Sequence, residues 1–198
     1  MATTTHTHHK IFRGDSLRTL LSEADLRGGV RQLADEIRDH YGEQPITIIA
    51  VLTGAVVLLA DLIRLLDMPL RIGFVRASSY RGQSTSSGHL VVDVKMLPDI
   101  RNKEVLLLDD IFDTGRTLLN LLHEMDHLNP ATIRSAALLR KQGQQQVAIE
   151  PDHVAFEIPN EFVVGYGLDY NDLYRNLPYL AALDPADLTL HSTQEHSA

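Results

Sequence analysis

Strand-like and helix-like segments alternate along this chain, and no other feature of the sequence constrains its fold as strongly. Short runs of β-branched and aliphatic residues are typical of buried strands, whereas apolar residues at every third or fourth position are typical of helices. Strands that alternate with helices form right-handed units, so this order predicts an α/β fold with a mainly parallel, twisted sheet flanked by helices. We expect strands at 45–52, 70–79, 104–110, 132–141, 153–158 and 161–167, and helices at 22–42, 53–67 and 115–128.

The bulk composition is compatible with one domain of this kind. The chain has 198 residues, 44% of them hydrophobic, which is enough to bury a sizeable core. We expect a folded domain over 15–185, preceded by a flexible N-terminal segment over 1–14 and followed by a flexible tail over 186–198. The N-terminal segment carries three histidines, in which we place no metal site.

Charge and cysteine content exclude several classes of protein. The formal net charge of −8 argues against a dedicated nucleic-acid binder, although a metal ion and backbone amides can still hold a small anionic substrate. There is no cysteine, which excludes a disulfide framework and thiolate chemistry. No apolar run approaches the ~20 residues of a membrane span, and the N-terminus lacks the apolar core of a signal peptide. We therefore expect a cytoplasmic protein with no nucleic-acid or membrane partner.

Polar residues follow four of the expected strands, at the point where each strand ends. In open parallel sheets, ligands bind beyond the carboxyl ends of the strands. We therefore expect these residues to converge on one cleft. They are Thr53 with Gly54, Ser79 with Tyr80, Asp109 with Asp110, and Lys141.

The segment VLLLDDIFDTGRTL begins as a buried strand and then carries three acids. We expect the buried part of the strand to end at Leu108, with the carboxylates of Asp109 and Asp110 beyond it and pointing the same way. Two such carboxylates repel each other unless a positive or hydroxylic group lies between them, and a vicinal diol with bound Mg²⁺ meets that need. The third acid, Asp113, lies beyond them in the turn.

The second half of this segment is suited to a phosphate. Its turn leads into a helix whose N-terminal amides and dipole favour an anion. Hydroxyl donors flank a glycine that allows close approach of the backbone, at Thr114, Gly115 and Thr117. A ribose 5-phosphate carries a diol and a phosphate together. A turn with acidic caps and a receiver-type acidic pocket are the alternatives, but the latter does not account for the phosphate turn, and the P-loop pattern is absent.

This segment is similar to the signature of type I phosphoribosyltransferases, which bind 5-phosphoribosyl 1-diphosphate (PRPP). Four further segments resemble the hypoxanthine-guanine phosphoribosyltransferase family in order and spacing: LTGAVVLLADLIR, ASSYRGQSTSSG, AALLRK and FEIPNEFVVGYGLDYNDLYRNLPY. The resemblance implies a type I phosphoribosyltransferase fold with a small hood formed by the terminal segments. It also implies purine salvage, in which PRPP and hypoxanthine or guanine give IMP or GMP and diphosphate.

The resemblance also implies which residues bind PRPP. The two adjacent acids would meet the ribose hydroxyls and the metal shell, and the turn at 113–117 would hold the 5′-phosphate. The turn at 53–54, which in this family often contains a non-proline cis peptide, and Arg175 would bind the pyrophosphate. Ser79 and Tyr80 would belong to a loop that closes over the reacting centre and excludes water. The complete set is Thr53, Gly54, Ser79, Tyr80, Asp109, Asp110, Asp113, Thr114, Gly115, Arg116, Thr117 and Arg175.

A second group of residues would bind the purine and the metal. Lys141 would donate to the 6-oxo group, Phe162 would stack on the ring, and the backbone of Val163 would face the 2-position. Asp113 would be the catalytic residue, acting as a general base or proton shuttle beside purine N7. Asp169 would ligate a second Mg²⁺, so that the implied metal ligands are Asp109, Asp110 and Asp169.

Each of these residues also has a plainer interpretation. Lys141 can be an ordinary solvated lysine, and Phe162 can be a core residue, although stacking requires the same flat apolar face. Asp169 can be a turn former, and Arg175 can form a surface salt bridge worth little. Taken together, the residues favour the functional interpretation over these separate ones.

Two residues depart from the family's pattern. The first acid of the pair is usually Glu, and Asp109 is one methylene shorter, so we expect its contact to ribose to run through water. Thr53 stands where some members have Lys, which removes one charge contact to the diphosphate. We therefore expect PRPP binding to depend strongly on Mg²⁺.

Two other functions remain open at the level of sequence. One is a regulator with this fold that binds nucleotide or RNA, and the other is a transferase for xanthine or a pyrimidine base. The resemblance further suggests a homodimer or homotetramer.

Overall fold

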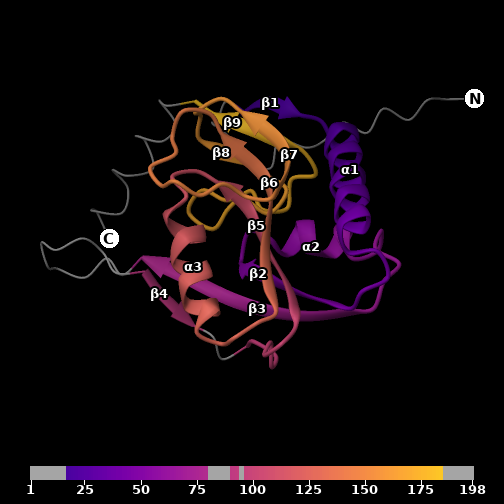
Figure 1. Cartoon of the computed structure of the whole chain (residues 1–198). Helices are drawn as coiled ribbons and strands as arrows, with labels where there is room; N and C mark the ends of the chain where they lie inside the picture. The colour runs from indigo at the N-terminus through magenta and orange to yellow at the C-terminus, as the bar shows by residue number, and fades with distance from the viewer. Residues whose placement is uncertain (1–16, 80–89, 94–95, 185–198) are drawn as a thin grey trace, which may run out of the picture.

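The computed structural model describes residues 17–79, 90–93 and 96–184. Within these ranges the strands form a six-stranded sheet and a three-stranded sheet, and Figure 1 shows the smaller sheet lying over one end of the larger. No described helix is long and apolar enough to cross a membrane. The elements are β1 (Leu17–Leu21), α1 (Glu23–Tyr41), β2 (Ile46–Leu52), α2 (Val56–Leu62), β3 (Leu70–Ser79), β4 (Leu90–Asp93), β5 (Glu104–Phe112), α3 (Arg116–Asp126), β6 (Thr132–Lys141), β7 (His153–Ile158), β8 (Val163–Val164) and β9 (Leu180–Leu183).

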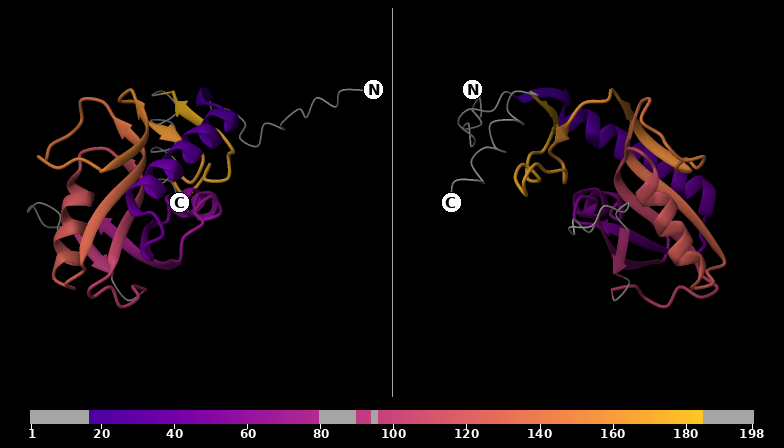
Figure 2. Two further views of the ribbon diagram at one scale, coloured as in Figure 1. Left: turned by 45° about the vertical axis from the view of Figure 1, so that its right-hand side comes forward. Right: turned by 90° about the vertical axis from the view of Figure 1, so that its left-hand side faces the viewer.

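The larger sheet has the order β4-β3-β2-β5-β6-β7 and confirms the expected mainly parallel arrangement. Strands β3, β2, β5, β6 and β7 pair in parallel, and β4 pairs antiparallel with β3. Because side chains alternate along a strand, β5 supplies both faces of the sheet. Leu106 and Leu108 pack in one core with α1 and α2, whereas Val105 and Leu107 pack in a second core with α3. Figure 2 shows α1 and α3 on opposite sides of the sheet.

The smaller sheet is the expected hood, and it joins the two ends of the described chain. Strand β9 lies between β1 and β8, and both pairs are antiparallel. Leu17 pairs with Leu183, and Val163 pairs with Ala182. All four residues of β9 are buried, so this small sheet has an apolar core of its own.

Two of the expected helices differ in how closely the structure follows them. Helix α1 begins with a capping box: the Asp25 amide donates to Ser22 Oγ at 3.2 Å, and the Ser22 amide donates to Asp25 Oδ2 at 2.9 Å. Helix α2 was expected over 53–67 and is shorter at both ends. Residues before it form a turn, in which the Val56 amide donates to the Thr53 carbonyl at 3.3 Å.

Strand β5 extends to Phe112, beyond the expected end at residue 110, although its continuous buried run does end at Leu108 as expected. Its pairing with β2 stops at Ala50 opposite Leu108, but its pairing with β6 continues to Phe112 opposite Arg140. The last residues of β5 therefore pair with β6, whereas β2 continues to Leu52 paired with β3 and no longer with β5. A strand predicted over 161–167 was also too long, because Gly165 and Gly167 have φ values of +99° and +102° and turn the chain after Val164.

Several predictions fall outside the described residues. Tyr80 and the terminal segments 1–14 and 186–198 are among them. Ser79 is the last residue of β3, as expected, but its side chain is not described. The proposed roles of Ser79 and Tyr80 in a closing loop stay predictions.

Candidate active site

The turn after β2 leaves room for a neighbouring acid. The peptide bond between Leu52 and Thr53 is cis, so the turn expected to bind pyrophosphate does contain such a bond. Gly54 is buried, and a Cβ atom added there would overlap the carboxylate of Asp110. The carbonyl oxygen of Gly54 in turn lies where a Cβ atom on Gly167 would have to go. The turn thus contacts both β5 and the segment that follows the hood strand β8.

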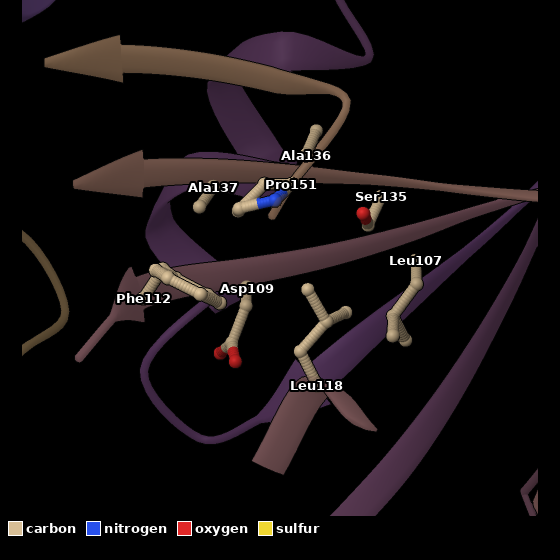
Figure 3. Close-up of a pocket in the computed structure, with 8 residues that line it drawn as sticks. All are labelled: Leu107, Asp109, Phe112, Leu118, Ser135, Ala136, Ala137 and Pro151. Atoms are coloured by element: carbon tan, nitrogen blue, oxygen red, sulfur yellow. The ribbon is translucent and has the colours of Figure 1, made fainter. Parts of the chain in front are cut away.

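The two adjacent acids of β5 line pockets on different faces of the sheet. Asp110 lines a pocket beneath the hood, with Asp113 and Lys141 among the other lining residues. Asp109 lines a small apolar pocket against α3, where Figure 3 shows its carboxylate directed toward Leu118. The expectation that both carboxylates point the same way is therefore wrong, because both residues lie in a strand and strand side chains alternate. Asp109 nevertheless supports its neighbour, since its Oδ1 accepts the Asp110 amide at 3.0 Å.

Both carboxyl groups have a raised pKa. Burial raises the pKa of Asp109 well above its usual value, and the adjacent Asp110 carboxylate raises it further. Burial also raises the pKa of Asp110, although backbone amides and the charge of Arg175 oppose that shift. A cation beside either carboxyl group would stabilise its charged form and lower its pKa, because it would offset the cost of burying a negative charge.

The pocket beneath the hood brings together most of the residues predicted for the purine. Its volume is about 210 Å³, and it lies between the carboxyl ends of β5 and β6 on one side and β8 with the following segment on the other. Sequence reasoning assigned six of its lining residues but missed its apolar walls, Ile111 and Leu168. The lining residues are Asp110, Ile111, Asp113, Lys141, Phe162, Val163, Leu168 and Asp169.

Lys141 and Asp113 form an ion pair inside this pocket. The Lys141 ammonium donates to Asp113 Oδ2 at 3.2 Å. The lysine side chain is only 12% exposed, whereas that of Asp113 is 43% exposed. Lys141 is the last residue of β6, where its backbone pairs with Ile158 of β7, so the sheet fixes the base of the side chain. A buried, paired ammonium does not fit the alternative of an ordinary solvated lysine.

Phe162 presents an aromatic surface to the same pocket. Its side chain is 40% exposed, which excludes the alternative that it is a core residue. The ring of Tyr170 meets it edge to face, with ring centroids 5.4 Å apart and an angle of 81° between the planes. The Phe162 carbonyl accepts the Leu183 amide at 3.0 Å, which ties its backbone to β9. No pattern in the sequence indicates the contact with Tyr170.

Arg175 is held in place by acids and by a backbone carbonyl. Its Nη2 lies 2.7 Å from Asp169 Oδ1 and 3.3 Å from Asp172 Oδ1. Its Nη1 donates to the Gly167 carbonyl at 2.8 Å. The other carboxylate oxygen of Asp169 accepts the Asp172 amide at 2.9 Å. Asp169 therefore does form a turn through one carboxylate oxygen, and its other oxygen pairs with the guanidinium of Arg175.

The N-terminus of helix α3 has features of an anion-binding site. Gly115 precedes it in the left-handed conformation, with φ +81°, and as a glycine it supplies no side-chain cap to the helix. A Cβ atom on Gly115 would overlap Val147 and the ring of Phe112, so only glycine fits. Thr114 Oγ1 accepts the Arg116 amide at 3.4 Å. The amides at a helix N-terminus are suited to a phosphate.

The donor set in the pocket is compatible with Mg²⁺. Among the described residues, no group of three or more His, Cys, Asp and Glu side chains is arranged to hold a metal ion. Mg²⁺ does not require one, because it is commonly bound by one or two carboxylates together with waters and substrate phosphates. Asp110 and Asp169 line one pocket and supply hard oxygen ligands of this type. Asp109 lies outside that pocket.

Comparison with known proteins gives one consistent result. Residues 19–171 match the family described as "Phosphoribosyl transferase domain". The hypoxanthine-guanine phosphoribosyltransferase of Staphylococcus epidermidis is 38% identical over 169 residues, which are 85% of this chain and 94% of that protein. That of Aquifex aeolicus is 39% identical over 170 residues, which are 85% of this chain and 96% of that protein.

A solved structure is also similar to this chain, in its fold as well as in its sequence. It is a crystal structure of a hypoxanthine-guanine phosphoribosyltransferase from Bacillus anthracis, with a TM-score of 0.77 and 37% sequence identity. The match covers 84% of this chain and 99% of that one. The similarity thus extends over most of the chain.

Proposed function

The chain belongs to the phosphoribosyl transferase family, and from this premise we propose that the pocket beneath the hood is its active site. The chain is an enzyme of the hypoxanthine-guanine phosphoribosyltransferase type and acts in purine salvage. It transfers 5-phosphoribosyl from PRPP to hypoxanthine or guanine, giving IMP or GMP and diphosphate. The observation that carries our assignment of the site is the pairing of Lys141 with Asp113 beside an exposed aromatic face.

The purine occupies this pocket with its polar edge toward the ion pair. Lys141 donates to the 6-oxo group and Asp113 accepts from the purine at N7, because a buried ammonium and a carboxylate are complementary to that edge. The ring stacks on Phe162, which Tyr170 supports from behind. The backbone of Val163 faces the 2-position. This arrangement favours 6-oxopurines over pyrimidine bases, which are smaller.

The phosphoribosyl group lies between β5 and the N-terminus of α3. The 5′-phosphate binds the turn of residues 113–117, where the N-terminal amides of α3 and the hydroxyls of Thr114 and Thr117 act as donors. Asp110 meets the ribose hydroxyls. Asp109 was expected to share this contact, and we assign it instead to orienting Asp110 through the backbone amide. The diphosphate binds the turn of Thr53 and Gly54 together with Arg175.

Mg²⁺ is the cofactor we assign to this site, with Asp110 and Asp169 as the carboxylates that hold it. When bound, the ion neutralises diphosphate charge as that group leaves. Asp169 exchanges its contact with Arg175 for this role, which frees the guanidinium for the diphosphate. The raised pKa of Asp110 is consistent with a carboxyl group that is completed by a cation.

The reaction forms the bond between purine N9 and ribose C1′ and breaks the bond between C1′ and the diphosphate oxygen. Positive charge develops on the ribose as the diphosphate leaves, and the carboxylate of Asp110 is placed to stabilise it. Asp113 accepts the proton that the purine loses. Closure by the loop that includes Ser79 and Tyr80 excludes water, which would otherwise capture the ribosyl centre.

The decisive experiment measures diphosphate release from PRPP with a panel of bases. We expect release with hypoxanthine and guanine and none with pyrimidines, and omission of Mg²⁺ should abolish it. Release with xanthine alone would replace the substrate assignment. No release with any base, but retained nucleotide or RNA binding, would favour the regulator.

We also propose that the enzyme is cytoplasmic and forms a homodimer or homotetramer. The support is indirect: in the hypoxanthine phosphoribosyl transferase of Trypanosoma cruzi, the C-terminal region bears on oligomeric state and activity. Sedimentation of the full chain with and without residues 186–198 measures both the assembly and the contribution of the tail.

A further inference from the structure

Tyr166 connects the segment after the hood to helix α2. Its hydroxyl donates to Asp61 Oδ2 at 2.7 Å. The tyrosine is only 6% exposed, so its ring is fixed by packing as well as by this bond. Burial, followed by the hydrogen bond to Asp61, raises the pKa of Tyr166 above its usual range, so the hydroxyl stays a donor at neutral pH. The other oxygen of Asp61 forms an ion pair with Arg64 of the same helical region.

Gly167, the residue after Tyr166, forms two hydrogen bonds with Arg175. The Gly167 amide donates to the Arg175 carbonyl at 3.0 Å, and Arg175 Nη1 donates to the Gly167 carbonyl at 2.8 Å. The Tyr166 amide is also fixed, because it donates to the Leu177 carbonyl at 2.9 Å. A change in the position of Tyr166 must therefore be passed to Gly167 and to the guanidinium of Arg175.

Gly167 also lies directly against the turn assigned to the diphosphate. A Cβ atom on Gly167 would overlap the Gly54 carbonyl oxygen, so the two backbones are in contact. Helix α2, which carries Asp61, begins immediately after that turn, with Ala55 as its N-cap. The chain thus closes a ring of contacts from Gly54 along α2 to Asp61, across to Tyr166, and back through Gly167.

We propose that Tyr166 and Asp61 are positioning residues that fix the Thr53–Gly54 turn relative to Arg175 and thereby set the affinity for the diphosphate end of PRPP. The proposal rests on the function proposed above, because both diphosphate-binding groups are assigned there. Tyr166 and Asp61 act through Gly167 and the N-terminus of α2 and do not line the purine pocket. Their bond therefore affects PRPP without affecting the purine.

The test uses Tyr166→Phe, Asp61→Ala and the double variant in the full chain. We expect each single change to weaken the binding of Mg-diphosphate and Mg-PRPP, measured by calorimetry, by about tenfold, which is what one hydrogen bond to a charged group is worth. The KM for hypoxanthine at saturating PRPP should stay unchanged. The double variant should be no weaker than either single variant, since both remove the same contact.

The matched control is Tyr41→Phe. It removes the hydroxyl of another buried tyrosine, which donates to the Val105 carbonyl at the opposite end of the sheet. It should leave diphosphate binding unchanged. An unchanged affinity in both single variants, an equal weakening of purine and PRPP, or additive effects in the double variant would overturn the proposal. If Tyr166→Phe fails to fold, Asp61→Ala alone still decides. Failure of the proposed function is a different result, because the unaltered chain would then neither bind PRPP nor release diphosphate.

Discussion

The Lys141 ammonium and the Asp113 carboxylate, which we assign to two neighbouring positions on the purine edge, lie 3.2 Å apart and bind each other. The free enzyme therefore keeps its base-recognition groups paired. A purine must replace this contact with two of its own, one to its 6-oxo group and one near N7. Since the lysine is almost buried, a base that cannot accept its hydrogen bond leaves a costly unpaired charge, which is a basis for selecting 6-oxopurines.

Asp113→Asn should lower kcat by roughly 10²–10⁴, the contribution of a general acid–base group, while PRPP still binds. The amide keeps the size of the side chain but cannot take up the purine proton. Steady-state kinetics with hypoxanthine and calorimetry with PRPP measure the two effects separately. Asp67→Asn, an exposed aspartate away from the pocket, is the control. Normal turnover in Asp113→Asn would remove this residue from the chemistry.

Lys141→Ala should raise the KM for hypoxanthine by about tenfold or more, which is the loss of one hydrogen bond from a charged group. Affinity for PRPP should change little. Of the described residues assigned to PRPP, Lys141 bonds to Asp113 alone. Lys103→Ala, at the opposite end of β5, serves as the matched control. Equal losses for purine and PRPP would mean that Lys141 is structural.

Gly54→Ala should weaken PRPP binding and destabilise the fold by about 1–3 kcal/mol, because the added methyl group overlaps the Asp110 carboxylate. Displacement of Asp110 also disturbs the residue assigned to ribose and metal. Gly28→Ala is the comparison, since nothing lies within 4 Å of a Cβ atom at Gly28. Thermal unfolding and PRPP titration of both variants test the prediction, and equal behaviour of the two would contradict it.

Tyr170→Leu should raise the KM for hypoxanthine several-fold, because it removes the edge-to-face contact that orients Phe162, a contact worth about 0.5–1.5 kcal/mol. Tyr170→Phe keeps the ring and should retain the KM of the unaltered enzyme. Kinetics with purine varied at saturating PRPP distinguish the two. If Tyr170→Phe is as impaired as Tyr170→Leu, the hydroxyl matters and the stacking argument is wrong.

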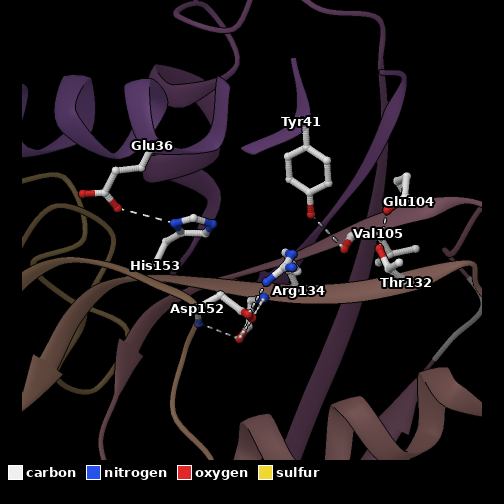
Figure 4. Close-up of polar contacts among 9 residues, drawn as sticks. Glu36, Tyr41, Glu104, Val105, Thr132, Arg134, Asp152 and His153 are labelled. Atoms are coloured by element: carbon white, nitrogen blue, oxygen red, sulfur yellow. Dashed lines mark hydrogen bonds and ion pairs between the residues drawn. The ribbon is translucent and has the colours of Figure 1, made fainter. Parts of the chain in front are cut away.

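Alkaline pH should destabilise the fold through Tyr41. Burial raises the pKa of Tyr41 to about 12, and its hydroxyl donates to the Val105 carbonyl at 3.5 Å (Figure 4). Since the unfolded chain ionises near the ordinary value of about 10, the stabilising difference is present below that pH and is lost as pH rises through the folded value. Over this interval the free energy of unfolding should fall by about 2–3 kcal/mol more than in Tyr41→Phe, as measured by denaturant titration at several pH values.

The sequence predicted the parts of the fold that depend on local pattern. Ser22 and Asp25 identify the start of α1, because a capping box needs only those two positions. Strands β2 and β5 were recognisable because each contains a continuous run of buried, mostly apolar residues. Lys141 and Phe162 could be assigned only through a family resemblance, and the structure adds the physical reason, namely their shared pocket.

The features that the sequence did not predict depend on contacts between distant segments. Leu17 of β1 pairs with Leu183 of β9, and neither short run has a pattern that names the other as its partner. The extension of β5 to Phe112 depends on how far β6 continues beside it. The separation of Asp109 from Asp110 follows from that extension, because adjacent residues diverge in a strand but not in a loose turn.

The early end of the pairing between β2 and β5 has a consequence for the backbone of the candidate site. Past Ala50, where this pairing stops, β5 borders a step in the sheet. Such an internal step would be a weak point in a structural sheet, since water can compete for its backbone groups. Here the carboxylate of Asp109 folds back and accepts the amide of Asp110. Asp109, which the family resemblance assigned to the substrate, therefore bonds a backbone amide of β5 just beyond the last residue that pairs with β2. We expect a substitution at Asp109 to loosen first the end of β5.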